Sequence, residues 1–160
     1  MDFGTESSIF NNMKAKTDIV IKSGGISGSL SGALDPLSKE AEEHANRYYD
    51  SVRKMTTDVQ SIAKNAGFSV EEIASVKDHV FYKEHDLGGD KKERFASDYD
   101  MAQSWQRLID GKQIEVHDLV LLKHELLEID FMRKGYSQQE AHDLTNLTFN
   151  YKDALERWRL

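Results

Sequence analysis

The sequence predicts an all-α single domain of five or six helices, arranged around a central buried helix at about residues 114–133. Three observations support this fold class. Apolar residues recur at intervals of three and four through most of residues 35–160, and capping residues or glycines separate these periodic stretches. The 160 residues also include one proline and no cysteine. A chain of this length can form one domain with a substantial core.

Residues 1–34 differ in composition from the rest. The segment from Ser23 to Gly32, SGGISGSLSG, is rich in glycine and serine, which favours a flexible tether. Residues 18–21 could still pair as a short strand. We therefore expect a tether at residues 1–34, which joins a helical domain at residues 35–160 to a parent polypeptide.

The first helix of the domain is expected to be long. Asp35 can act as its N-cap with Pro36 at the first helical position, and Gly67 can end it. The apolar positions between them are Ala41, Ala45, Tyr48, Val52, Met55, Val59 and Ile62. Such a stripe predicts one amphipathic helix of about eight turns that packs on the central helix, in preference to a surface for a partner or a coiled coil.

Capping signals place the shorter helices. Ser69 with Glu72, and Ser137 with Glu140, have the spacing of capping boxes. Between residues 97 and 111, Ser97 or Asp98 can start a helix and Gly111 can end it. A last short helix is expected to contain Ala154, Leu155 and Trp158. The segment from His79 to Phe95 reads as an irregular segment or short hairpin that folds over the central helix.

The central helix, Ile114 to Arg133, is predicted to be apolar on two opposite faces. The first face contains Val120, Leu121, Leu127, Phe131 and Met132, and the second contains Leu119, Leu122, Leu126 and Ile129. Two narrow polar edges are left, which consist of Lys123 and Asp130 on one side and of Asp118 and Glu125 on the other. A helix of this kind lies between other elements.

The first face also carries His117, His124 and Glu128. Residues four apart share one side of a helix, and His117 lies nearly two turns earlier along the same line. Ionisable groups in such a position need partners, because burying them unpaired costs several kcal/mol. We therefore predict a metal site formed by His117, His124 and Glu128, with a divalent ion such as Zn²⁺ or Mn²⁺. The alternative is a hydrogen-bonded network of neutral histidines in a core.

Three further residues are candidates for catalysis. Glu125 follows His124 directly, and His79 and His85 lie in the segment that is expected to cover the central helix. We predict that one of Glu125, His79 and His85 acts as a general base and that the others complete the site.

Two other metal chemistries are suggested by spacing. His124-Glu125-x-x-Glu128 resembles the His-Glu-x-x-His motif of zinc peptidases with its second histidine replaced, so a peptidase would need another ligand, and His142 is the only histidine that follows. His117 and Asp118 form an adjacent His-Asp pair, as in HD-type phosphohydrolases. Without cysteine, any metal must be held by histidines and carboxylates.

Composition excludes several classes. A formal net charge of −7 argues against a broad basic surface for duplex nucleic acid. No apolar run reaches the roughly 20 residues of a membrane span, and no export signal is recognised, so we expect a soluble chain without a membrane partner. No phosphate-binding glycine loop or Gly-x-Ser-x-Gly elbow occurs.

Several stretches together carry a family resemblance: GFSVEEIASVKDHVF, EHDL, SDYDMAQSWQRLIDG, HDLVLLKHELLE, KGYSQQEAH and FNYKDAL. They resemble a helical domain at the C-terminal ends of phage minor-head (head-morphogenesis) proteins and of related bacterial polymorphic toxins. The resemblance covers about residues 45–155. It implies an effector or toxin-like module that is phage-associated or delivered by a secreted parent protein, with nucleic acid as a substrate or an immunity protein as a partner.

The sequence pattern and the family resemblance together lead us to one hypothesis and one alternative. The hypothesis is a phage-derived toxin or effector domain that is a metal-dependent hydrolase of the nuclease or phosphodiesterase type. The alternative is a non-catalytic helical interaction module of a phage particle or secreted protein, in which the polar residues of the central helix form a structural network.

Overall fold

The computed structural model describes residues 34–160, and all of the fold below refers to them. Residues 1–33 of the tether predicted at residues 1–34, and the short strand considered there, lie outside this range. The described chain forms seven α-helices and one π-helix, with no strand longer than an isolated bridge. The predicted all-α class is confirmed, and there are more helices than the five or six predicted because the first long helix is divided in two. The helices are α2 (Lys39–Lys54), α3 (Asp58–Ala66), α4 (Val70–Lys77), α5 (Tyr99–Asp110), α6 (Val116–Arg133), α7 (Gln138–Asn146) and α8 (Tyr151–Arg159); the π-helix is η1 (Asp78–Tyr82).

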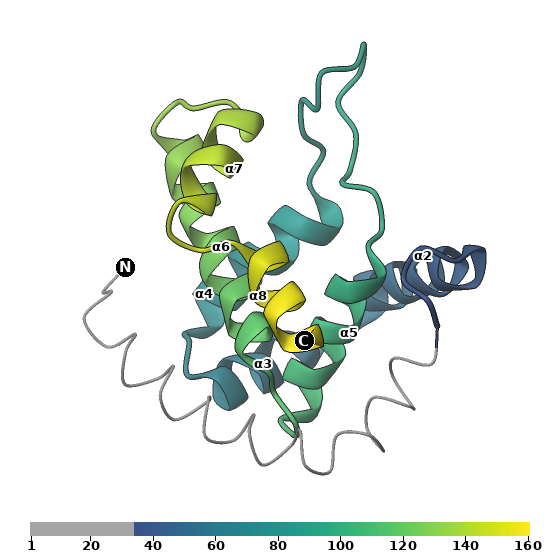
Figure 1. Cartoon of the computed structure of the whole chain (residues 1–160). Helices are drawn as coiled ribbons and strands as arrows, with labels where there is room; N and C mark the ends of the chain where they lie inside the picture. The colour runs from purple at the N-terminus through teal and green to yellow at the C-terminus, as the bar shows by residue number, and fades with distance from the viewer. Residues whose placement is uncertain (1–33) are drawn as a thin grey trace.

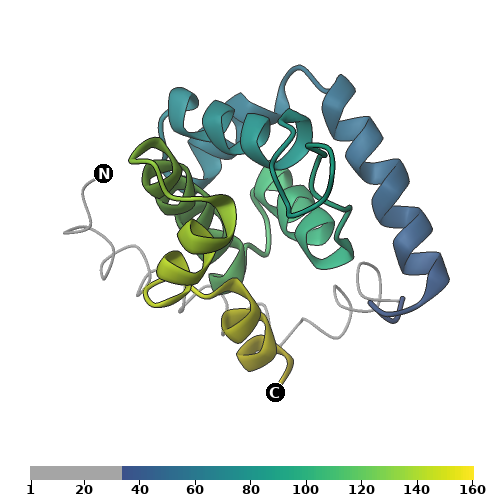
Figure 2. The ribbon, with the colours of Figure 1, turned by 90° about the horizontal axis from the view of Figure 1, so that it is seen from above.

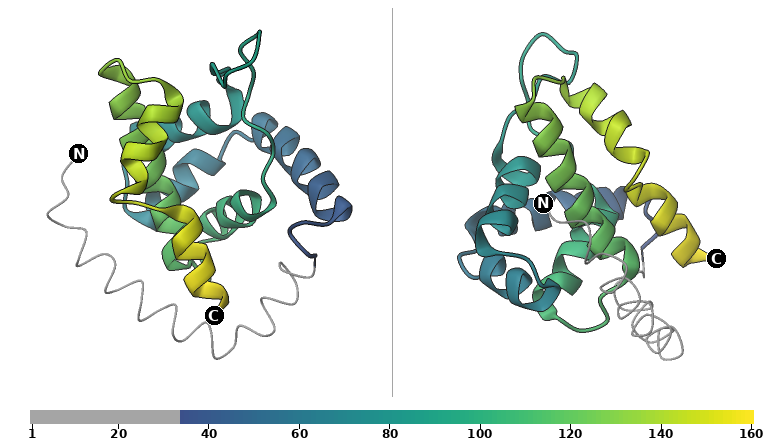
Figure 3. Two further views of the ribbon diagram at one scale, coloured as in Figure 1. Left: turned by 45° about the horizontal axis from the view of Figure 1, so that its top comes forward. Right: turned by 90° about the vertical axis from the view of Figure 1, so that its left-hand side faces the viewer.

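Helix α6 is the central element, as the sequence predicts. It packs against α4, η1 and α5 and, elsewhere on its surface, against α7 and α8. Figure 3 shows α7 and α8 following one side of α6, with the N-terminal helices on the other side. None of the helices formed by residues 34–160 combines the length and the hydropathy that a membrane span needs.

The main core lies on the side of α6 that faces the N-terminal helices. Leu119, Leu122 and Leu126 of α6 meet Ile62 of α3 and Trp105 of α5 there. The two narrow polar edges predicted for α6 are a partial error, because Asp118, Lys123 and Glu125 are buried. Helices surround α6 so closely that these charged groups are covered as well, and each of them then requires partners.

The predicted eight-turn first helix is wrong in its length. Ser38, and not Asp35, is the N-cap of α2, and its hydroxyl accepts a hydrogen bond from the backbone N–H of Ala41 at 3.1 Å. The chain then breaks between α2 and α3, where Met55 has an extended backbone. Regular apolar spacing continues through the break, which is why the pattern conceals it. Figures 1 and 2 show α2 as a separate helix at the edge of the molecule.

Side chains from outside the two helices stabilise this break. The ammonium group of Lys77 donates to the carbonyl oxygen of Met55 at 3.0 Å and to Oδ1 of Asp58 at 2.9 Å. Oδ2 of Asp58 accepts from the indole N–H of Trp105 at 3.1 Å. Asp58 therefore joins α3, α4 and α5 through one buried carboxylate.

The shorter helices begin where their capping signals predict. Both capping boxes form, with Ser69 and Glu72 at α4 and with Ser137 and Glu140 at α7. Asp98 caps α5, and Gly111 ends it at φ +70°. At this angle a residue with a Cβ would be strained, and the Asn65 side chain occupies the same space.

Helix α4 continues into η1, where one π turn buries His79, Val80 and Phe81. Such turns are often found at functional sites. The chain after it is a loop that doubles back, and a single antiparallel bridge joins His85 to Glu93. The irregular segment or short hairpin expected from His79 to Phe95 is therefore found only after Tyr82, because residues 79–82 belong to η1. Figure 1 shows it at the same end of the molecule as α7.

We predict that Asp58→Ala lowers the free energy of unfolding by about 3–5 kcal/mol, because it leaves the buried ammonium of Lys77 without its counter-charge. The matched control is Asp50→Ala, which removes an exposed ion pair with Arg53 and should cost less than about 1 kcal/mol. Urea denaturation of both variants measures the difference. Equal losses would show that the carboxylate of Asp58 has no special role.

Candidate metal centre

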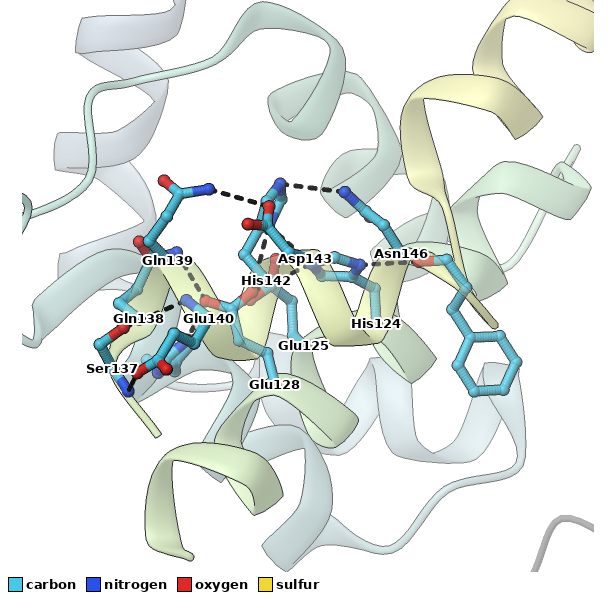
Figure 4. Close-up of polar contacts among 12 residues, drawn as sticks. His124, Glu125, Glu128, Ser137, Gln138, Gln139, Glu140, His142, Asp143 and Asn146 are labelled. Atoms are coloured by element: carbon cyan, nitrogen blue, oxygen red, sulfur yellow. Dashed lines mark hydrogen bonds and ion pairs between the residues drawn. The ribbon is translucent and has the colours of Figure 1, made fainter. Parts of the chain in front are cut away.

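The site is built on two residues of α6 that lie four positions apart. Nε2 of His124 lies 2.9 Å from Oε2 of Glu128, and both side chains are almost fully buried. Figure 4 shows these residues and Glu125 on α6, opposite Gln138 and His142 on α7. The spacing of His124 and Glu128 follows from the helix repeat alone.

The tautomer of His124 follows from the contact of its second ring nitrogen, Nδ1. Nδ1 lies 2.8 Å from the carbonyl oxygen of Phe149. A carbonyl oxygen only accepts, so Nδ1 carries a hydrogen. Nε2 of the neutral ring is then a lone pair that faces a carboxylate oxygen, and a cation must lie between them. That cation is either a proton or a metal ion.

The same contacts determine the pKa of His124. Burial acts to lower this pKa, but the hydrogen bond with Glu128 and the charge of Glu125 outweigh burial and raise it. For Glu128, burial acts to raise the pKa, and hydrogen bonds from His124, His79 and Gln138 lower it instead. Glu128 is therefore a carboxylate in the folded protein, although it is buried.

His142 of α7 is the third member of a first group of possible ligands, which consists of His124, Glu128 and His142. Its Nδ1 lies 3.2 Å from Nε2 of His124 and 3.6 Å from Oε2 of Glu128. A tetrahedral ion with ligands at about 2.0–2.1 Å separates ligand atoms by roughly 3.3 Å. The three separations of 2.9, 3.2 and 3.6 Å therefore suit one ion. The His142 side chain is 42% exposed, so this position is accessible from solvent.

From the sequence, His142 is predicted only as the extra ligand that a peptidase would require. It lies 14 positions after Glu128, on a different helix, and reaches the site because the chain turns back after α6. Gly135 makes this turn at φ +105°. A glycine followed by a capping box was the only local signal that α7 folds back along α6.

A second group of possible ligands consists of His79, Glu125 and Glu128. It uses the other carboxylate oxygen of Glu128, Oε1. Nε2 of His79 is 3.4 Å from Oε1 of Glu128 and 3.6 Å from Oε2 of Glu125. The amide of Gln138 donates to Oε1 of Glu128 at 2.8 Å. Among the described residues, His79, Glu125 and Glu128 form a group that could hold a metal ion, as do His124, Glu128 and His142.

Glu125 is the least satisfied member of the site. Its Oε2 is buried and has no hydrogen-bond partner among residues 34–160. Burial raises the pKa of Glu125, and the nearby charge of Glu128 raises it further. A buried carboxyl group with a free oxygen is suited to accept a proton or to bind a cation.

His85 lies behind His79 and does not face Glu128. Its Nε2 donates to the carbonyl oxygen of His79 at 2.8 Å, and its ring stacks on Phe95. Burial lowers the pKa of His85, which favours the neutral ring that makes this bond. His85 therefore orients the segment that carries His79, and its predicted catalytic role stays a prediction.

The prediction that His117 shares this site is wrong. His117 belongs to a separate buried network, in which its Nε2 accepts from Arg107 at 2.9 Å and its ring packs against Trp158 of α8. Arg107 also binds both carboxylate oxygens of Asp118 at 2.8 Å. The adjacent His-Asp pair is therefore occupied by a guanidinium group, which removes the basis for an HD-type site.

A cleft of about 470 Å³ lies beside the second group, and its lining includes His79, His85 and Gln138. Six charged residues of both signs also line it: Lys83, Lys92, Arg133, Asp78, Glu84 and Asp86. Since His79 and Gln138 both contact Glu128, a molecule in the cleft would lie one side chain away from the shared carboxylate.

Comparisons with known proteins identify no relative. No family model, no curated protein and no solved structure matches the chain. The family resemblance described from the sequence therefore stays a prediction.

We predict that His117 weakens folding as the pH drops through the range set by its pKa, against the opposite contributions of His124 and Glu125, whose pKa values are raised. Burial lowers the pKa of His117 to about 4, an effect that Asp118 opposes and Arg107 reinforces. Between about 6.5 and 4 the unfolded chain binds a proton that the folded chain does not, so folding is weakened by up to roughly 3 kcal/mol. Urea denaturation of the wild type and of His117→Gln from pH 7 to pH 4 measures this loss as the difference between the two curves. His117→Gln should gain stability relative to the wild type as the pH falls, and a constant difference would contradict the assignment.

Proposed function

We propose that this domain is a metal-dependent hydrolase whose ion is bound by His124, Glu128 and His142. One observation carries the proposal: three ligand atoms from two helices lie 2.9, 3.2 and 3.6 Å apart. The bond from Nδ1 of His124 to the Phe149 carbonyl supports it, because metal-binding histidines usually donate their second N–H to such an acceptor.

A catalytic site is favoured over a structural one. Structural zinc sites are closed by four protein ligands, whereas catalytic sites use three and leave a position for water. The described residues supply three ligands here, and one of them, His142, is partly exposed. An ion held by His124, Glu128 and His142 would polarise a substrate oxygen and would lower the pKa of bound water.

The predicted general-base role of Glu125 stays a prediction. Its Oε2, which has no hydrogen-bond partner among residues 34–160, is placed to accept a proton, but the same oxygen also suits a cation. His79 contacts both Glu125 and Glu128 and so orients the two carboxylates relative to each other.

For the substrate, we propose a phosphodiester, as in a nuclease-type effector of phage origin. The resemblance to minor-head proteins and polymorphic toxins supports this class. Lys83, Lys92 and Arg133 in the cleft could contact phosphate oxygens. We propose delivery by a larger parent protein, which would give the chain an immunity protein as a partner.

A peptidase is the second candidate, favoured by one specific observation. His142 supplies the ligand that the His-Glu-x-x-Glu pattern lacked, so the set becomes two histidines and one glutamate, with Glu125 directly after the first ligand. Thermolysin-type zinc sites use the same ligand types.

We predict that the purified chain binds Zn²⁺ or Mn²⁺, and that His124→Ala lowers metal affinity at least 100-fold and abolishes hydrolysis. Elemental analysis and titration measure binding, and assays on RNA, DNA, a nitrophenyl phosphodiester and casein separate the substrate classes. His44→Ala is the control, because His44 lies on α2 among Tyr48, Tyr99 and Gln103.

Expression in bacteria adds an independent test. An active effector should arrest growth, and His124→Ala should relieve the arrest. A chain that binds no metal, with a His124→Ala variant that is only less stable, would instead support the non-catalytic interaction module.

A further inference from the structure

The two oxygens of Glu128 face different partners. Oε2 faces His124 and His142, and Oε1 faces His79 and Gln138. We propose that Glu128 bridges two metal ions, and that the second ion is bound by Nε2 of His79, Oε2 of Glu125 and Oε1 of Glu128. This inference rests on the proposed function, because Glu128 is a ligand of both sites.

The free oxygen of Glu125 is the first argument for a second ion. The Glu125 side chain is only 9% exposed, and its Oε2 has no hydrogen-bond partner among the described residues. This is the same oxygen that lies 3.6 Å from Nε2 of His79. A native protein rarely buries a carboxylate oxygen without a donor or a cation.

Ligand geometry is the second argument. His79 lies 3.6 Å from Glu125 and 3.4 Å from Oε1 of Glu128, and all ligand atoms of this group are within 4.8 Å of one another. These separations resemble those of the first group. A carboxylate that binds one ion with each oxygen holds the ions at about the 3.5–4 Å separation of two-metal hydrolases.

The surrounding contacts keep the second group in place. Gln138 donates to Oε1 of Glu128 at 2.8 Å, and a carboxylate oxygen has a second lone pair for an ion. His85 donates to the backbone of His79 and stacks on Phe95. The π turn of η1 therefore directs the His79 ring towards α6, and the contacts of His85 hold the backbone of His79 in place.

Charge indicates the substrate class. Two divalent ions carry +4 and the two glutamates −2, which leaves +2 at the centre, while the three histidines are neutral ligands. Such a centre attracts an anion and favours a phosphodiester over a peptide. The cleft lined by His79 and Gln138 gives access to the second ion.

The test is a titration of the full chain, freed of metal by a chelator, with Mn²⁺. Equilibrium dialysis counts the bound ions, and electron paramagnetic resonance detects magnetic coupling between them. We expect two ions per chain and a coupled pair. His79→Ala and Glu125→Gln should each bind one uncoupled ion through the first group, and His142→Ala should bind one through the second.

Two controls keep the result interpretable. Glu125→Gln preserves the size of the side chain, so circular dichroism should show a folded protein even where His79→Ala is less stable. His44→Ala lies outside both groups and should still bind two coupled ions.

Each other outcome overturns a definite statement. One ion in the wild type, lost in His124→Ala, would overturn the second site and leave the proposed function standing. Wild-type stoichiometry in both His79→Ala and Glu125→Gln would also overturn the second site. Absence of any bound Mn²⁺ or Zn²⁺ would overturn the second site and the proposed function together.

Discussion

The carboxylate of Glu128 is a buried negative charge on which three segments of the chain converge. It lies on α6, accepts a hydrogen bond from Gln138 of α7, and faces His79 of η1 and His124 of its own helix. A buried carboxylate is stable only where positive or hydrogen-donating groups surround it. The packing of α7 and of the π turn against α6 is therefore linked to the charge balance at this one side chain.

The fold separates two buried polar networks along α6. Near its start, Arg107 binds Asp118 and His117 and packs on Trp158, so that this network attaches α8 and α5 to the central helix. Further along, the histidines and glutamates around Glu128 have no guanidinium among them. In the first network a fixed cation of the protein itself, Arg107, neutralises the carboxylate of Asp118. In the second, the carboxylate of Glu128 faces histidines and an amide, and these histidines and glutamates could hold a metal ion.

The two groups of the site are reached from solvent through different residues. One group reaches solvent through His142, which is partly exposed, and the other borders the cleft through His79 and Gln138. Between them the carboxylate of Glu128 is closed off. A substrate that contacts both groups would have to span this carboxylate, as phosphodiesters do in two-metal hydrolases.

The sequence by itself determined what depends on neighbours a few positions apart. Both capping boxes, the two-sided burial of α6 and the pairing of His124 with Glu128 follow from the helix repeat, and the structure has all of them. The break after α2 and the arrival of His79 and His142 at Glu128 were decided by the tertiary structure alone. The separation of His117 from the site already follows from the helix rise, because seven residues at about 1.5 Å each put His117 out of reach of an ion at His124. Only its binding by Arg107 of another helix was decided by the tertiary structure. Contacts between distant segments depend on how helices turn and pack, and no local periodicity records them.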